Sequence, residues 1–195
     1  MSGAARLGRA QSPLRLEVIV GSVRAGRFAP TVADWFLRTV RADPDFDTGK
    51  LDLLEFPLPQ DLSENDAVRL FRRRLAAADA FVLVTSEYNH GYPAALKTAI
   101  DSAKHEWRGK PVGFVSYGGV SGGLRAVEQL RQVVAEVHMV SVRESVSFHR
   151  VRGQFGAEGE TADGAAIDGA GRMLRQLSWW GKALRTARDA GPYPG

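Results

Sequence analysis

The stretch VIVGSVRAGRFAPTVADWF, residues 18–36, joins an apolar segment to a helical pattern through a short polar turn. Residues 18–20 are continuously apolar, as expected for a strand that is buried on both faces of a parallel sheet. Pro30 suits the first turn of a helix, and apolar residues recur at helical spacing from there to about Arg41. The stretch therefore predicts a strand, a loop and a helix in direct succession.

The same succession repeats along the rest of the chain. Strands that alternate with helices are typical of a doubly wound α/β domain, whose five-stranded parallel sheet is covered by helices on both faces. We expect one such domain at residues 14–190, flexible tails at 1–13 and 191–195, and a long loop at 149–167 that is mobile or functional. Further strands are expected at about residues 49–56, 80–89, 110–119 and 138–148, and further helices at about 65–78, 93–104, 123–137 and 168–188.

The composition excludes several kinds of chemistry. The 195 residues include no cysteine, so the chain has no disulfide, thiolate nucleophile or cysteine-based metal site, and His105, His138 and His149 lack metal-ligand spacing. A redox reaction would therefore need a bound cofactor. No apolar run reaches the roughly 20 residues of a membrane span, and no secretory signal is evident, so we expect a cytoplasmic protein without membrane contact.

The net charge of +4 raises the question of a nucleic-acid partner, because phosphate neutralisation dominates that kind of binding. The basic residues are spread along the chain, however, and the one tight run, Arg72 to Arg74, follows Glu64 and Asp66. We interpret that run as a solvated helix face and expect no nucleic-acid partner.

Three loops should meet at one edge of the sheet, because ligands of open α/β sheets bind outside the carboxyl ends of the strands. The loops are GSVRAGR at 21–27, TSEYNHGYP at 85–93 and SYGGVSGG at 116–123. They are the segments of the chain that are richest in glycine and polar residues. We therefore expect the ligand at these three loops.

The first loop has the features of an anion site. A strand that turns directly into a helix points backbone N–H groups and the positive end of the helix dipole into the turn. Ser22 adds a hydroxyl, and Arg24 and Arg27 add guanidinium groups that suit phosphate. An ordinary turn with two solvated arginines is the alternative.

Two familiar phosphate-binding patterns do not fit this loop. Gly21 and Gly26 have the spacing of a P-loop, but Arg27 and Phe28 follow where a P-loop has lysine and then serine or threonine. Val23 stands where the dinucleotide fingerprint has its second glycine, and its side chain would keep a pyrophosphate from the backbone. A single terminal phosphate is the better interpretation.

The other two loops suit a planar ring. Glu87, Tyr88 and Asn89 follow a buried strand directly, and an aromatic surface with an amide there could hold a heterocycle. The four glycines of residues 116–123 let backbone N–H groups approach a ring edge that carries carbonyl oxygens. Turn formation explains each loop singly about as well, but the convergence of three loops favours binding.

Together these motifs resemble those of the NAD(P)H-dependent FMN reductases, a family of the flavodoxin-like superfamily. The resemblance covers about residues 14–145 and rests on GSVR at 21–24, EYNHGYP at 87–93 and the glycine pairs at 118–119 and 122–123. It implies a flavodoxin-like fold with strand order 2-1-3-4-5, FMN as cofactor, and NADPH or NADH as cosubstrate.

The resemblance also implies where FMN would lie. Its phosphate would be held by the first loop, its isoalloxazine would border the second, and its pyrimidine edge would meet the third. The family usually has proline before Glu-Tyr-Asn, whereas this chain has Ser86, which bears on the rigidity of that loop. The residues implied in cofactor binding are Ser22, Arg24, Arg27, Phe28, Glu87, Tyr88, Asn89, His90, Ser116, Tyr117, Gly118 and Gly119.

The implied reaction moves a hydride from the nicotinamide to flavin N5 without a catalytic side chain, because the cofactor carries the chemistry. A small acceptor, such as a quinone, flavin, azo compound, nitro compound or metal oxyanion, then takes the electrons by a ping-pong mechanism. Family members are commonly homodimers or homotetramers, with the helix after Tyr92 at the interface. The alternative is a flavodoxin-like electron-transfer protein that serves a protein partner, although such proteins are typically acidic.

The remaining chemistry-bearing side chains have simpler interpretations. His90 is expected at the surface of the second loop, where it could contact a substrate. The apolar positions of the last helix and its tryptophan pair are expected to pack on the sheet: Met173, Leu174, Leu177, Trp179, Trp180 and Leu184.

Overall fold

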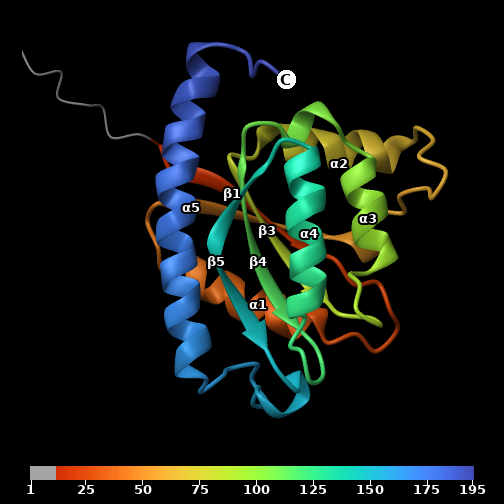
Figure 1. The fold of residues 1–195 in the computed structure, drawn as a ribbon, viewed down its shortest axis with the longest axis vertical. Coiled ribbons are helices and arrows are strands. Elements are labelled where there is room, and N and C mark those ends of the chain that lie inside the picture. Colours follow the sequence, from red (N-terminus) through yellow and green to blue (C-terminus); the bar gives the residue numbers. More distant parts are fainter. Residues whose placement is uncertain (1–11) are drawn as a thin grey trace, which may run out of the picture.

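The computed structural model describes residues 12–195, which fold around one central sheet (Figure 1). The sheet has five strands in the order β2-β1-β3-β4-β5, and all neighbouring strands are parallel. The predicted fold class and strand order are therefore confirmed. The expected tail at 1–13 lies almost entirely outside the described residues. The strands are β1 Leu14–Val20, β2 Phe46–Asp52, β3 Ala80–Ser86, β4 Pro111–Tyr117 and β5 Val140–Phe148.

Helices cover both faces of this sheet, and the last of them runs the length of the molecule (Figure 1). None of the helices within residues 12–195 combines the length and apolarity that crossing a bilayer requires. The α-helices are α1 Ala29–Arg41, α2 Asp66–Ala77, α3 Ala94–Asp101, α4 Leu124–Glu136 and α5 Gly164–Ala190, and the 3-10 helices are η1 Leu53–Glu55, η2 His105–Trp107 and η3 Val151–Gly153.

Two apolar cores, one on each face of the sheet, explain the continuous apolar run of the first strand. Successive side chains of a strand point to opposite faces. Val18 and Val20 accordingly lie in the core that α1 and α5 cover, and Ile19 lies in the core that α2, α3 and α4 cover. Burial on both faces thus explains why residues 18–20 are all apolar.

Two element boundaries differ from the sequence prediction. The second strand ends at Asp52 rather than near residue 56, because the Asp52 carboxylate accepts a hydrogen bond from the N–H of Leu54 and starts η1. The last helix begins at Gly164 rather than near Asp168, because Asp163 caps it by accepting from the N–H of Ala166. Local side-chain caps therefore shift both boundaries.

Most of the expected packing of the last helix is observed, with one exception. Met173, Leu174 and Leu177 are buried against the sheet, and Trp180 and Leu184 are partly buried, but Trp179 is 65% exposed. Trp179 follows Leu177 by two positions, which is about 200° around a helix, so it points away from the core. The prediction that Trp179 packs on the sheet is wrong.

The basic run on α2 is also more than a solvated face. Nε and Nη2 of Arg74 donate to the two carboxylate oxygens of Glu17 at 2.9 and 2.8 Å, and the Glu17 side chain is fully buried in β1. Glycine at position 49 leaves room for this carboxylate, because a Cβ atom there would lie 2.7 Å from the Glu17 carboxyl carbon. A buried carboxylate needs such a partner, so Arg74 has a structural role that the sequence did not indicate.

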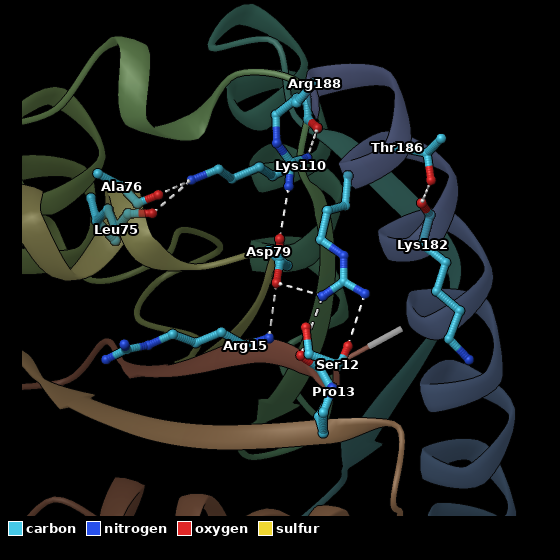
Figure 2. Close-up of polar contacts among 12 residues, drawn as sticks. Ser12, Pro13, Arg15, Leu75, Ala76, Asp79, Lys110, Lys182, Thr186 and Arg188 are labelled. Carbon is cyan, nitrogen blue, oxygen red and sulfur yellow. Dashed lines mark hydrogen bonds and ion pairs between the residues drawn. The ribbon is translucent and has the colours of Figure 1, made fainter. Parts of the chain in front are cut away.

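Asp79 fastens the end of α5 to the amino edge of the sheet (Figure 2). Its carboxylate accepts hydrogen bonds from the backbone N–H of Arg15 at 3.1 Å, from Arg188 at 3.0 Å and from Arg185 at 3.4 Å. Arg188 also donates to the carbonyl of Gly109 at 2.6 Å. One carboxylate thus links β1, the start of β3 and α5 at the edge opposite the carboxyl ends.

The neighbouring Lys110 is buried, and its side chain caps the carboxyl end of α2 (Figure 2). Its ammonium group donates to two carbonyls in the last turn of the helix, those of Leu75 at 2.7 Å and Ala76 at 3.1 Å. The Leu75 carbonyl also accepts from the N–H of Ala78 at 3.1 Å. Burial, with repulsion from Arg188 and partial compensation by Asp79 and Glu106, lowers the pKa of Lys110 to about 8.

This shift predicts a pH-dependent stability. Between about pH 8 and 10.5 Lys110 loses its proton in the folded chain but keeps it in the unfolded one, so the free energy of unfolding should rise with pH, by up to about 3 kcal/mol. Urea unfolding over this range measures the slope. The Lys110→Met variant should lack the Lys110 contribution, and equal slopes in both proteins would contradict the assignment.

Candidate functional site

A cavity of about 360 Å³ opens at the carboxyl ends of β1, β3 and β4. All three expected loops contribute to its wall, as does η3, which follows β5. The architecture therefore brings together segments that are far apart in the sequence. The residues that line the cavity are Arg24, Ala25, Gly26, Arg27, Phe28, Ser86, Glu87, Tyr88, Tyr117, Gly118, Val151 and Arg152.

The two arginines of the first loop are in different environments. Arg27 donates to both carboxylate oxygens of Asp52 at 2.6 and 2.7 Å, and only 11% of its side chain is exposed. This hydrogen-bonded pairing raises the pKa of Arg27 above its ordinary value. Arg24 is exposed, and no carboxylate among the described residues pairs with it. Arg24 is therefore the cation that this loop offers to an anion.

Backbone donors of the first loop are available to a ligand. Arg27 also donates to the carbonyl of Ser22 at 2.6 Å, and since the peptide is trans, the N–H of Val23 points the opposite way. Within the described chain, the N–H groups of residues 22–26 donate to no protein acceptor. The Ser22 hydroxyl is buried and shares a 2.7 Å hydrogen bond with the Tyr88 hydroxyl.

The second loop has an unusual backbone. Asn89 and His90 have φ angles of 49° and 73°, a region that residues other than glycine seldom adopt. Tyr88 and Gly91 enclose them by exchanging N–H···O bonds of 2.9 and 3.0 Å. Such conformations persist only where the surrounding structure imposes them, so neighbouring residues hold this tight turn in its conformation.

Arg125, at the start of α4, holds the second loop in place. Its Nε donates to Glu87 at 2.6 Å, and its Nη1 lies 2.6 Å from Nε2 of His90. Burial would raise the pKa of the Glu87 carboxyl, but hydrogen bonds from Ser121 and Arg125 outweigh it and hold that pKa below its ordinary value. Gln129 adds a hydrogen bond to the His90 carbonyl at 3.0 Å.

The segment that follows β5, residues 149–151, hydrogen-bonds the carbonyl groups of the third loop. The N–H groups of Val151 and Arg150 donate to the carbonyls of Gly118 and Gly119 at 3.1 and 2.7 Å, and His149 Nδ1 lies 2.8 Å from the carbonyl of residue 120. Because trans peptides point C=O and N–H in opposite directions, the N–H groups of residues 119–121 face away from this segment. In the part of the chain that the structure describes, none of these three N–H groups donates to an acceptor.

Ser116 lies near the third loop but supports it from behind. Its hydroxyl is fully buried and lies 2.9 Å from the carbonyl of Gly122 and 3.3 Å from that of Val146. The side chain is therefore committed to the loop rather than exposed to a ligand. Of the residues expected to contact the cofactor, those outside the cavity wall are Ser22, Asn89, His90, Ser116 and Gly119.

The 149–167 segment contributes residues that sequence analysis did not assign. Val151 is buried and Arg152 is exposed, and both line the cavity. The Phe155 ring packs edge-on against Phe28, with ring centres 5.6 Å apart. No periodicity signals these roles, because η3 is short and its partners lie more than 100 residues earlier or in the glycine loop. The mobility expected for this segment stays a prediction.

No group of histidine, aspartate and glutamate side chains that could hold a metal ion occurs within residues 12–195. The chain also carries no cysteine. The ligands that this edge offers are instead the Arg24 guanidinium, backbone N–H groups and hydroxyls. This donor set suits an anion and the carbonyl-bearing edge of a ring.

Comparison with known proteins gives one consistent family. A model of the family described as NADPH-dependent FMN reductase matches residues 14–153. An NAD(P)H-dependent FMN reductase of Schizosaccharomyces pombe is 39% identical over 136 residues, which cover 64% of this chain and 68% of that protein. A 2-hydroxy-1,4-benzoquinone reductase of Burkholderia sp. is 31% identical over 134 residues, which cover 66% of this chain and 69% of that protein.

Solved structures agree on the fold. The flavoenzyme NAD(P)H:(acceptor) oxidoreductase FerB from Paracoccus denitrificans aligns with a TM-score of 0.70 over 87% of this chain and 98% of its own. The two sequences are 24% identical, so this likeness supports the flavodoxin-like fold alone.

We predict that Arg125→Ala loosens the second loop. Loss of the Arg125 bonds to Glu87 and His90 should cost the turn about 1 kcal/mol and speed hydrogen exchange at the Gly91 amide by roughly 5-fold. Exchange measured by NMR tests this directly. Arg73→Ala, which removes an exposed arginine of α2, is the matched control. Unchanged exchange at Gly91 would show that Arg125 does not hold the turn.

Proposed function

Because the chain belongs to the NADPH-dependent FMN reductase family, we propose that the cavity at the carboxyl edge binds FMN and that NADPH or NADH reduces it. The protein is an oxidoreductase of the NAD(P)H-dependent FMN and quinone reductase type. The cofactor contacts, the electron acceptor and the order of the steps belong to the proposal.

The observation that carries the proposal is the row of unpaired N–H groups at residues 119–121, which directly follows Gly118 of the cavity wall. An isoalloxazine has a pyrimidine edge with two carbonyl oxygens, and three consecutive donors beside the second loop match such an edge. Residues 149–151, which follow β5, keep these donors oriented by bonding the carbonyls of residues 118–120, so little reorganisation would accompany binding. This donor row therefore fits FMN.

The first loop fits the FMN phosphate. The N–H groups of residues 22–26 and the Arg24 guanidinium supply donors and charge, as a dianion requires. Arg27, expected from the sequence to bind the phosphate, has its charge neutralised by Asp52. We propose instead that Arg27 acts on the phosphate through the Ser22–Val23 peptide that it orients.

Bound FMN supplies the hydride and electron chemistry, so the protein has to bind, orient and shield rather than to transfer protons itself. Phe28 and Val151 contribute apolar side chains to the cavity wall, and Tyr88 contributes an aromatic ring. Glu87 stays ionised and is held by Arg125, which fits a positioning role rather than acid catalysis.

We propose a quinone or another small planar compound as acceptor. The names of several relatives support this class, among them the Burkholderia benzoquinone reductase and a probable NADPH:quinone oxidoreductase of Oryza sativa. A planar acceptor that replaces the nicotinamide at the same open site would give ping-pong kinetics. Such a site makes few specific contacts and would discriminate weakly among acceptors.

We propose a homodimer or homotetramer, which sedimentation velocity measures. An apolar groove of about 350 Å³ beside α3 supports this proposal. The exposed Leu54 and Val23 lie in its wall, and a second copy would remove them from water. Val23 belongs to the first loop, so this interface would adjoin the phosphate site.

The decisive experiment follows the absorption spectrum of the protein incubated with FMN under anaerobic conditions. We expect a bound flavin spectrum that bleaches on addition of NADPH or NADH and recovers on addition of a benzoquinone. Absence of bound flavin would contradict the proposal. A bound flavin that neither nucleotide bleaches would instead favour an electron-transfer protein with a protein partner.

We predict that Arg24→Ala weakens FMN binding by about 1.5–3 kcal/mol, the range for hydrogen bonds to charged groups. Riboflavin lacks the phosphate, so its affinity should change little. Isothermal titration with both flavins measures the difference, with Arg73→Ala as the control for loss of charge. Equal losses for the two flavins would place Arg24 away from the phosphate.

A further inference from the structure

Arg152 is a cation of the cavity wall to which the proposed function gives no role. Its side chain lines the cavity and is exposed, and within the described part of the chain its guanidinium group makes no ion pair or hydrogen bond. Because the group is both exposed and part of the wall, it lies where the cavity meets solvent. A positive charge at that place is available to a ligand that enters from solution.

The backbone that carries Arg152 is held in place. The side chain of Val151 lies in the core that α1 and α5 cover, and the N–H groups of Val151 and Arg150 donate to carbonyls of the third loop at 3.1 and 2.7 Å. The N–H of Gly153 donates to the Arg150 carbonyl at 3.0 Å within η3. Successive side chains of a 3-10 helix are about 120° apart, so Arg152 points away from the core that Val151 enters.

The other charges of the cavity wall are balanced, with one further exception. Glu87 is the one carboxylate among the described residues that line the cavity, and Arg125 neutralises it. The charge of Arg27 is neutralised by its own carboxylate partner. Arg24 and Arg152 are therefore the two wall cations that have no counter-charge in the described chain.

The sheet sets these two cations apart. Arg24 follows β1 and Arg152 follows β5, and the ends of β3 and β4 lie between them in the order of the strands. In the proposed function, Arg24 and the first loop bind the phosphate of FMN. The anionic end of the cofactor then has its cation, and Arg152 is left for a different anion.

The electron acceptor is the ligand that suits this position. In a ping-pong reaction the acceptor enters from solvent after the nicotinamide has left, so it passes the exposed part of the wall. A cation at the entrance attracts anionic reactants over a distance, and a guanidinium group binds planar oxyanions directly. A flat site with few specific contacts discriminates weakly, so charge would become the property that sorts acceptors.

We propose that Arg152 makes this protein select electron acceptors that carry a negative charge, such as quinones with an ionised hydroxyl group or a carboxylate. This inference rests on the proposed function and names a substrate class for it. Arg152 acts on the binding of the acceptor and takes no part in the transfer of electrons.

The experiment compares two acceptors of nearly the same shape. 2-Hydroxy-1,4-naphthoquinone is an anion at neutral pH, and its methyl ether, 2-methoxy-1,4-naphthoquinone, is neutral. In ping-pong kinetics kcat/KM for the acceptor does not depend on the nucleotide, so it reports on the acceptor alone. The measured quantity is the ratio of kcat/KM for the anionic acceptor to kcat/KM for the neutral one.

We expect Arg152→Gln to lower this ratio about 3- to 10-fold, between the effects of an exposed ion pair and of a hydrogen bond to a charged group. Arg152→Lys keeps the charge and should keep most of the ratio. Added salt should lower the ratio of the wild type more than that of Arg152→Gln, because salt screens an exposed charge.

Arg150→Gln is the matched control. Arg150 is also exposed and lies two positions before Arg152, but it does not line the cavity. Its substitution removes the same charge from the same segment and should keep the ratio. Thermal unfolding of every variant verifies that each one is folded at the temperature of the assay.

Binding without turnover gives a second measurement. 2-Naphthoate and the neutral 2-naphthamide are planar compounds that accept no electrons from the protein, and their binding is followed by the change in the absorption spectrum of the bound FMN. Arg152→Gln should weaken the binding of 2-naphthoate relative to 2-naphthamide by a similar factor.

The outcomes separate this inference from the proposed function. An unchanged ratio in the folded Arg152→Gln variant would overturn the selection by charge, and so would equal losses for both acceptors, while the reductase function itself would stand. A loss of kcat/KM for NADPH but not for NADH, with an unchanged acceptor ratio, would assign Arg152 to the 2′-phosphate instead. If the wild type binds no FMN, the proposed function fails and this inference fails with it.

Discussion

Parallel pairing of all five strands is the constraint on which the rest of the molecule depends. It sends every carboxyl end to one edge and every amino end to the other. The amino edge is fastened by Asp79 and the buried Lys110, which bind α5 and α2 to the sheet. The carboxyl edge is left to loops, and there backbone donors without acceptors accumulate.

Backbone hydrogen bonding decides which groups these loops present. Residues 149–151, which follow β5, hydrogen-bond the carbonyls of residues 118–120, and the N–H groups of residues 119–121 therefore point away from this segment. Arg27 does the same for one peptide of the first loop. In both loops a donor of the protein bonds the C=O of a peptide group, so the N–H of the same peptide group stays available to a ligand. A site with oriented donors, in a chain whose described residues hold no metal-ligating group, suits an anionic, carbonyl-bearing cofactor.

Much of this could be predicted from the sequence. The alternation of apolar strands and amphipathic helices predicts the doubly wound sheet, and the loops after β1, β3 and β4 stand out by their glycines and polar residues. Side-chain roles were less predictable. Arg24 and Arg27 are alike in the sequence, yet Asp52 neutralises only Arg27. Trp179 and Trp180 are adjacent, yet only Trp180 reaches the core. Arg74 belongs to a basic run, yet it serves the buried Glu17.

The sequence by itself determined the succession of elements, the edge at which the glycine-rich and polar loops meet and the character of the first loop, because these follow from local periodicity and from the chemistry of neighbouring residues. Only the tertiary structure decided which arginine is paired with a carboxylate and which N–H groups stay unpaired. Those outcomes depend on the register between strands tens of residues apart. No local pattern encodes that register, since it results from packing both cores at once.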